Sequence, residues 1–184
     1  MKQLKMLRVS APAPEVVLPD GYRIEMFRGT QEEINDWLEI VADGLIRVEG
    51  EENFNRSIRN FSGLVPEQDL FFVVNDEGKR VATTAAVVRP NGAGYIHMVG
   101  SLSAARGRGL GRAMLAYGLG MLEARGVPYT YLTTDDKRLP AIKGYLDADF
   151  LPVLWADPDS DMRARWDAVL ANLHYRQVEY LPEE

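Results

Sequence analysis

A short segment near the middle of the chain combines three arginines with three glycines, and it runs Arg106-Gly107-Arg108-Gly109-Leu110-Gly111-Arg112. Glycines let the backbone turn sharply and approach a ligand without interference from a Cβ atom. The arginines add positive charge, and a helix that begins directly after the turn would direct its unpaired N–H groups at the loop. Together these features predict a phosphate-binding site, most naturally one for a pyrophosphate.

Spacing separates this loop from two other classes of glycine-rich phosphate loop. A P-loop requires Lys followed by Ser or Thr after its last glycine, whereas Gly111 is followed by Arg112-Ala113. A dinucleotide-binding loop requires glycine at its first, third and sixth positions, and Arg112 occupies the sixth. The pattern that fits the segment is Arg-x-x-Gly-x-Gly, at Arg106, Gly109 and Gly111.

This pattern resembles the acetyl-CoA loop of the GNAT acetyltransferase superfamily, which cradles the pyrophosphate of coenzyme A. The resemblance implies acetyl-CoA as cosubstrate and no metal. It also implies that backbone groups just upstream of the loop pair with the pantetheine arm and the acetyl carbonyl. The usual proline three residues before the loop arginine is replaced by Ser103, which leaves the local bend open. The implied coenzyme A site comprises Val99, Gly100, Ser101, Arg106, Gly107, Arg108, Gly109, Gly111, Arg112 and Arg138.

In this family an amine attacks the thioester of acetyl-CoA directly, so a general acid for the leaving thiolate is expected. Tyr145 is the candidate, because it ends a segment from Ala141 that is similar to the family's Ala-x-x-x-Tyr segment, and Phe150 matches the aromatic that closes the motif. Asp149 replaces the usual glycine before that aromatic. Arg138 stands where an asparagine often helps to hold coenzyme A, and it could instead meet a phosphate or a substrate carboxylate.

His97 is the candidate general base. It lies on the strand before the loop, where alternation is expected to place it on one face with Tyr95 and Val99. Its position resembles that of a histidine in arylalkylamine acetyltransferases, where histidines on this strand relay the amine proton. An ordinary histidine pKa of about 6.5 suits proton transfer at neutral pH. Other family members use a water molecule or a distant carboxylate instead, and a packed strand histidine with no catalytic role is the alternative.

Two adjacent aspartates, Asp135 and Asp136, follow the strand expected over 129–133. One is expected to cap the next helix. Helix capping explains one aspartate but not two, so the second is expected to face the cleft. Asp135 is predicted to bind a cationic amine substrate there.

The composition limits the function classes. The chain has 184 residues, of which 46% are hydrophobic and 26% charged, as is usual for a globular domain. A formal net charge of −6 argues against binding nucleic acid through a basic face. The sequence contains no cysteine, so disulfides, thiolate metal sites and a cysteine nucleophile are excluded. His97 and His174 do not show metal-ligand spacing.

The N-terminal segment, residues 1–14, carries two lysines but no continuous apolar core, so it does not resemble a signal peptide. No stretch of the sequence reaches the apolar length needed to span a bilayer. We therefore expect a cytoplasmic protein without a membrane partner.

Hydrophobic periodicity and turn residues predict the order of the elements. Strands are expected over 22–27, 70–75, 81–88, 95–102, 129–133 and 151–155, and a last strand over 175–180. Helices are expected over 34–45, behind a capping box formed by Thr30 and Glu33, and over 53–61, 114–125, 139–148 and 162–173.

This order predicts a mixed α/β fold, in which an antiparallel portion precedes a parallel strand–helix–strand crossover. The order over residues 20–155 also resembles the GNAT fold. The resemblance implies a central sheet of about six to seven strands, flanked by helices and splayed between the fourth and fifth strands. Because Pro12, Pro14 and Pro19 punctuate the start of the chain, we expect residues 1–20 to form an N-terminal arm and residues 21–184 a single domain.

The function expected from the resemblance is an acyltransferase that moves an acetyl group from acetyl-CoA to a primary amine of a small molecule. Two alternatives stay open. One is a module that binds or senses acetyl-CoA without turnover, and the other is a protein acetyltransferase acting on N-termini or lysines. The segment after Trp155 could supply the surface of a homodimer.

Overall fold

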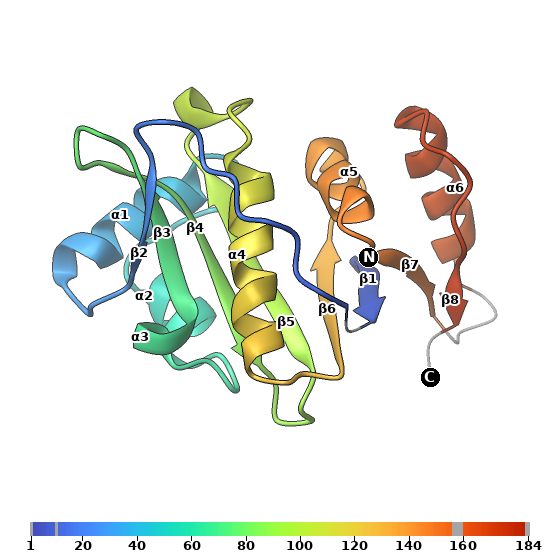
Figure 1. The fold of residues 1–184 in the computed structure, drawn as a ribbon, viewed down its shortest axis with the longest axis horizontal. Helices are drawn as coiled ribbons and strands as arrows, with labels where there is room; N and C mark the ends of the chain where they lie inside the picture. Colours follow the sequence, from blue (N-terminus) through green and yellow to red (C-terminus); the bar gives the residue numbers. More distant parts are fainter. Residues whose placement is uncertain (1, 10, 156–159, 183–184) are drawn as a thin grey trace.

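The computed structural model describes residues 2–9, 11–155 and 160–182. These residues form a mixed eight-stranded sheet with the strand order β2-β3-β4-β5-β6-β1-β7-β8 (Figure 1). The strands are β1 (Leu4–Val9), β2 (Arg23–Met26), β3 (Leu70–Val74), β4 (Arg80–Val88), β5 (Gly94–Ser101), β6 (Tyr129–Thr134), β7 (Leu151–Leu154) and β8 (Leu181–Pro182). The helices are α1 (Gln31–Ala42), α2 (Glu52–Phe54), α3 (Pro66–Asp69), α4 (Leu110–Ala124), α5 (Leu139–Asp147) and α6 (Met162–Asn172).

Two helical layers enclose the antiparallel half of the sheet. Helix α4 covers one face of β3–β5, and α1 with α2 covers the other (Figure 1). The predicted capping box starts α1, since the Thr30 side chain accepts from the Glu33 N–H and the Glu33 carboxylate accepts from the Thr30 N–H. The buried face of α1, which includes Trp37, then fixes this helix on the sheet. The expected helix over 53–61 is irregular, with a π-helical turn over Asn55–Arg59.

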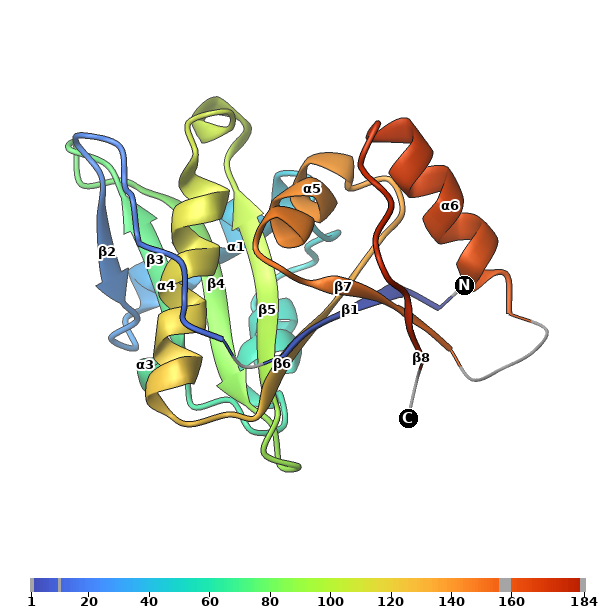
Figure 2. The ribbon, with the colours of Figure 1, turned by 45° about the vertical axis from the view of Figure 1, so that its right-hand side comes forward.

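Strands β5 and β6 separate shortly after they pair. Helix α4 connects them as a parallel crossover, but their register contains only Gly94 opposite Thr130 and Tyr95 opposite Tyr131. Beyond these pairs the strands diverge, and the ribbon in Figure 2 shows them leaving their common end. This confirms the expected splay between the fourth and fifth predicted strands.

The N-terminal segment differs from the expected arm. Strand β1 lies inside the sheet and pairs in antiparallel register with both β6 and β7. Its side chains alternate, so that Leu4, Met6 and Arg8 are buried, but the prolines that follow obscure this short pattern in the sequence. Residues 11–22 then pass along α4 on their way to β2 (Figure 1). The Ala13 N–H donates to the carboxylate of Glu123, which lies on α4.

The C-terminal end also differs from the expectation. The predicted strand over 175–180 is wrong, because the last strand, β8, covers only Leu181–Pro182 and pairs in parallel with β7. Residues 175–180 lie beside α6 instead, and their aromatic side chains make hydrogen bonds: the Tyr175 hydroxyl donates to Asp147, and the Tyr180 hydroxyl donates to Asp167. The alternation of aromatic and polar residues there reflects packing against helices.

Candidate active site

A cleft made of two adjoining parts lies between the diverging strands. Its wider part, here called the groove, has a volume of about 590 Å³ and runs from the glycine loop along the end of β5. Its narrower part, here called the pocket, has a volume of about 150 Å³ and lies between β5, β6 and α5. Both parts are lined by Leu45, Val99, Arg138 and Ala141, so they adjoin, and the hydrogen bond from Arg138 to the Leu45 carbonyl lies at their junction.

The glycine loop presents backbone to the groove. Gly107 and Gly109 adopt φ values of +77° and +82°, which disfavour side chains, and Gly109 is the N-cap of α4. A Cβ atom at Gly107, Gly109 or Gly111 would meet only open space, so a ligand can approach this backbone closely. Within the described residues, the N–H groups of Gly107, Arg108 and Gly109 have no acceptor. These donors and the start of α4 form a site suited to an anion.

The Arg106 side chain holds the loop in place. Its guanidinium donates to the main-chain carbonyls of Asp43 and Ser101 and to the Asp43 carboxylate. Asp43 also accepts from the Ser103 N–H at 2.6 Å, and this hydrogen bond, together with Arg106, holds the pKa of the Asp43 carboxyl below its usual range. The arginine therefore ties the end of α1 to the loop. No local pattern pointed to Asp43, which lies 63 residues away from Arg106 in the chain.

Two other arginines of the predicted coenzyme A site lie apart from the groove. Arg108 donates to the Tyr22 hydroxyl at 3.0 Å, and Arg112 is exposed on the first turn of α4. Neither lines the groove. Their predicted contact with coenzyme A stays a prediction, and it would require them to turn towards a bound phosphate.

A β-bulge redirects the end of β5. Met98 adopts a φ of +54°, and the pairing with β4 shifts so that His97 lies opposite Ala85 but Gly100 lies opposite Thr83. Because of this extra residue, Val99 packs on the α4 side of the sheet, whereas Tyr95 and Met98 pack on the α1 side. The expectation that His97 and Val99 share one face is therefore wrong.

The bulge leaves the end of β5 facing the cleft. Val99, Gly100 and Ser101 all line the groove, as the resemblance implied. A Cβ atom at Gly100 would lie 3.3 Å from the Leu45 side chain, so a larger residue would press on the loop that follows α1. The β5 backbone is thus positioned where an elongated ligand would run.

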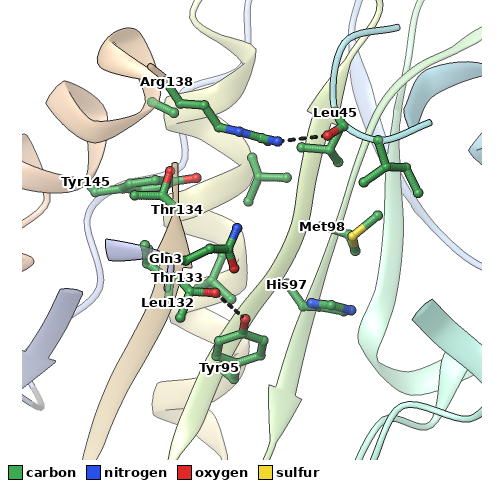
Figure 3. Close-up of a pocket in the computed structure, with 14 residues that line it drawn as sticks. Gln3, Leu45, Tyr95, His97, Met98, Leu132, Thr133, Thr134, Arg138 and Tyr145 are labelled. Carbon is green, nitrogen blue, oxygen red and sulfur yellow. Dashed lines mark hydrogen bonds between the residues drawn. The ribbon is translucent and has the colours of Figure 1, made fainter. Parts of the chain in front are cut away.

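Tyr145 extends from α5 into the pocket (Figure 3). Its side chain is 8% exposed and packs against the ring of Phe150, with ring centroids 6.1 Å apart. Burial raises the pKa of the Tyr145 hydroxyl to about 12. The hydroxyl therefore keeps its proton at neutral pH and is available as a donor.

His97 lines the pocket on the opposite side, from β5 (Figure 3). Its ring stacks on Phe61 at 4.0 Å between centroids, and its Nε2 lies 2.8 Å from the Ser57 carbonyl oxygen. Burial lowers the pKa of His97 to about 4, well below the value of about 6.5 expected from the sequence. The neutral ring donates from Nε2 to that carbonyl, which leaves Nδ1 as its acceptor atom.

Asp135 takes part in a network that crosses the mouth of the pocket. Its carboxylate accepts from Gln3 Nε2 at 3.0 Å and from Arg138 Nε at 2.8 Å, and the Gln3 hydrogen bond is the main cause of the lowered pKa of Asp135. Arg138 Nη2 donates in turn to the Leu45 carbonyl at 2.8 Å, a bond drawn in Figure 3. Asp135 itself does not line the pocket. Gln3 does, and sequence reasoning missed it because the first residues were expected to lie outside the domain.

The second aspartate has a structural partner as well. Asp136 binds Arg165 of α6 through both carboxylate oxygens, at 2.8 and 2.5 Å. The expectation that one of the two aspartates caps α5 is wrong, since this helix has no side-chain cap and its N-cap residue is Arg138. Both carboxylates are engaged by arginines: Asp135 by Arg138, three residues along the chain, and Asp136 by Arg165 on α6.

The described residues contain neither a metal-binding cluster nor a membrane-spanning helix. No group of three or more His, Asp or Glu side chains in this part of the chain is arranged to hold a metal ion. No helix of that same part is both long enough and apolar enough to cross a membrane.

Comparison with known proteins identifies the family. Residues 34–150 match the sequence model of the acetyltransferase (GNAT) family. The chain belongs to this family. The match covers the glycine loop, both diverging strands and Tyr145, so the resemblance inferred from the loop is confirmed.

Curated relatives of this GNAT chain include two bacterial mycothiol acetyltransferases. The protein from Thermomonospora curvata is 27% identical over 152 residues, which cover 80% of this chain and 50% of that protein. The protein from Beutenbergia cavernae is 31% identical over 152 residues, which cover 74% of this chain and 47% of that protein. The chain thus spans about half the length of these relatives.

Solved structures confirm the GNAT fold. A GCN5-related N-acetyltransferase from Sphaerobacter thermophilus superposes with a TM-score of 0.66 at 25% sequence identity. The superposition covers 83% of this chain and 49% of that one.

Proposed function

We propose that this chain transfers an acetyl group from acetyl-CoA to a primary amine of a small molecule. The observation that carries the proposal is the pair of adjoining cavities, which places a loop suited to an anion at one end and a pocket containing a protonated tyrosine at the other. Membership of the acetyltransferase family and similarity to mycothiol acetyltransferases support the same chemistry.

In this proposal the two ends of acetyl-CoA occupy the two parts of the cleft. The pyrophosphate would lie on the N–H groups of the glycine loop and the start of α4. The pantetheine arm would then follow Val99, Gly100 and Ser101. Strand β6 has already diverged from β5 at this point, so this edge of β5 is accessible. The thioester would reach the junction of groove and pocket, beside α5.

The reaction requires two proton transfers, one from the attacking amine nitrogen and one to the departing sulfur of coenzyme A. The amine nitrogen attacks the thioester carbonyl carbon, a tetrahedral intermediate forms, and the C–S bond then breaks. We assign the Tyr145 hydroxyl to protonate the departing sulfur, because it projects into the pocket and is protonated at neutral pH. We assign the amine proton to His97 Nδ1, directly or through one water, since Nε2 is occupied by the Ser57 carbonyl.

The size of the pocket favours a small acceptor. A volume of about 150 Å³ suits a small molecule better than the open groove that an N-terminus or lysine of a protein would need. The sequence prediction that Asp135 binds the amine directly is harder to support, because Gln3 and Arg138 already occupy its carboxylate. A cytoplasmic location and a homodimer stay predictions, and size-exclusion chromatography would test the second.

Release of free coenzyme A in the presence of a panel of small amines tests the proposal. The protein has no cysteine, so a thiol reagent added to the reaction reports coenzyme A alone. We expect thiol release that depends on both acetyl-CoA and an amine, with one acetylated amine formed for each thiol. Coenzyme A binding without release for any amine would instead support an acetyl-CoA sensor, and release only with peptides would support a protein acetyltransferase.

A further inference from the structure

Arg138 occupies the junction between the groove and the pocket, and it lines both. Among the described residues that line the pocket, it alone carries a formal charge when His97 is neutral. The remaining polar side chains of the pocket are hydroxyls, an amide and the imidazole, from Gln3, Tyr95, His97, Thr133, Thr134 and Tyr145. The pocket therefore offers one fixed cation and no lining carboxylate.

The guanidinium of Arg138 is held in place on two sides. Arginine has five N–H donors, and here Nε donates to Asp135 and Nη2 donates to the Leu45 carbonyl, which leaves three. Nη1 has no partner within the described residues. Gln3 fixes Asp135 from the other side. An arginine immobilised in this way loses little conformational freedom when it binds a further group.

The shape and charge of the remaining donors fit an anion. Unused N–H groups of a guanidinium match the oxygens of a carboxylate or a phosphate, and such charge-assisted bonds are strong. Arg138 lies at the end of the groove that adjoins the pocket, where the proposed reaction would take place. A polyamine would bring further positive charge to a pocket that has no acidic side chain to receive it.

We propose that the acceptor is an amine that also carries an anionic group, a carboxylate or a phosphate, and that Arg138 binds this group and so selects the acceptor. The inference rests on the proposed acetyl transfer and specifies its substrate class. Arg138 would act as a specificity residue, with Asp135 and Gln3 as positioning residues behind it. Of the two partners that the sequence allowed for Arg138, coenzyme A and a substrate anion, the geometry points to the second.

Matched pairs of amines test the proposal. The pairs are alanine with ethylamine, phenylalanine with phenethylamine, and phosphoethanolamine with ethanolamine, so that the first two report a carboxylate and the third a phosphate. For wild-type protein we expect kcat/KM to be about 10- to 100-fold higher for the anionic member of at least one pair, the range of a charge-assisted hydrogen bond. In Arg138→Gln this ratio should collapse towards one, while the affinity for coenzyme A in calorimetry stays within about threefold.

A control variant isolates the position of the charge. Arg163→Gln removes an arginine of α6 whose guanidinium lies over the Tyr180 ring, outside both the groove and the pocket, and it should keep the wild-type ratio. Equal kcat/KM within every pair for wild-type protein would overturn the proposal. A large loss of coenzyme A affinity in Arg138→Gln, with the ratio retained, would overturn it too, because Arg138 would then serve the donor.

A binding measurement separates this inference from the proposed reaction. With coenzyme A bound, N-acetylphenylalanine should bind wild-type protein more tightly than N-acetylphenethylamine, and Arg138→Gln should remove the difference. This result would support anion recognition even if no amine were acetylated, in which case the proposed transfer alone would fail. Equal affinities for the two acetylated compounds would overturn anion recognition whatever the turnover.

Discussion

The two parts of the cleft are built in different ways. At its loop end the groove is formed by backbone, since three glycines and the first turn of α4 present N–H groups that no side chain covers. The pocket is formed by side chains that come from Gln3 just before β1, the loop after α1, strands β5 and β6, and the start and body of helix α5. A backbone site suits an anion whatever the side chains around it, whereas a site made of side chains can change its ligand with few substitutions.

The two parts also differ in how their charges are balanced. At the loop, Arg106 is engaged with Asp43 and leaves the amides to meet an anion. At the pocket, Arg138 is engaged with Asp135 but keeps three N–H groups for another partner. Arg106 thus holds the loop whose backbone amides could bind an anion. Arg138 instead has N–H groups of its own that could bind one directly.

The largest expected effect is on chemistry in the pocket. Tyr145→Phe should lower turnover by roughly two to four orders of magnitude, the range for a general acid, and should leave coenzyme A affinity nearly unchanged. Because the pKa of Tyr145 is about 12, its ionisation should not reduce wild-type turnover between pH 7 and about 10. The measurement is single-turnover acetyl transfer, in which chemistry limits the rate.

Tyr117→Phe is the matched control for Tyr145. It also removes one hydroxyl, which contacts the Met26 sulfur at 3.8 Å and lies outside the cleft. We expect it to keep wild-type turnover. Equal turnover in both phenylalanine variants would show that Tyr145 serves packing only.

The next effect concerns the groove. Gly109→Asp would place a side chain and a negative charge where the pyrophosphate is expected, so coenzyme A affinity should fall on the order of 100-fold. Gly92→Asp provides the control, because Gly92 has a φ of +83°, close to the +82° of Gly109, and equally open surroundings, but lies in a distant hairpin. Calorimetry that gave the same affinity for both variants would refute the loop assignment.

A smaller effect concerns His97 and pH. If His97 accepts the amine proton, the acidic limb of kcat/KM should lie near pH 4, where the histidine titrates in the folded protein, and His97→Gln should move or abolish it. An unchanged limb in the glutamine variant would place the base elsewhere.

The same histidine should affect stability in a defined pH window. Its pKa is about 6.5 in the unfolded chain and about 4 in the folded one, so the unfolded state binds more protons between these values. Stability should therefore be complete above pH 6.5 and fall as the pH drops to 4, by at most about 3 kcal/mol. Urea unfolding of wild type and His97→Gln, compared at each pH, isolates this contribution from that of the carboxylates.

The smallest expected effect tests the support behind Arg138. Gln3→Ala removes the amide that holds Asp135, so KM for an anionic acceptor should rise roughly two- to tenfold, the worth of one hydrogen bond. Coenzyme A affinity should not change, because Gln3 lines the pocket but not the groove. A fall in kcat with an unchanged KM would argue against this positioning role.

Local patterns accounted for much of the fold. The capping box at Thr30 and Glu33 and the hairpin between β3 and β4 could be predicted because each depends on neighbours within a few residues. The crossover through α4 followed from the strand–helix–strand order of elements that are each visible locally. The start of the chain could not, since three prolines suggested an arm and a six-residue strand gives a weak periodic signal. Its pairing with β6 joins residues 120 to 130 positions apart, from Val9 with Tyr129 to Leu4 with Thr134.

By itself, then, the sequence determined the glycine loop, the order of most elements and the family, because glycine spacing and hydrophobic period act locally. Only the tertiary structure decided how the pocket is made. The bulge at Met98 turns Val99 away from the face of His97, burial lowers the histidine pKa, and a strand from the N-terminus brings Gln3 to Asp135. Each of these depends on contacts between distant segments, whose energies appear only when the chain has folded.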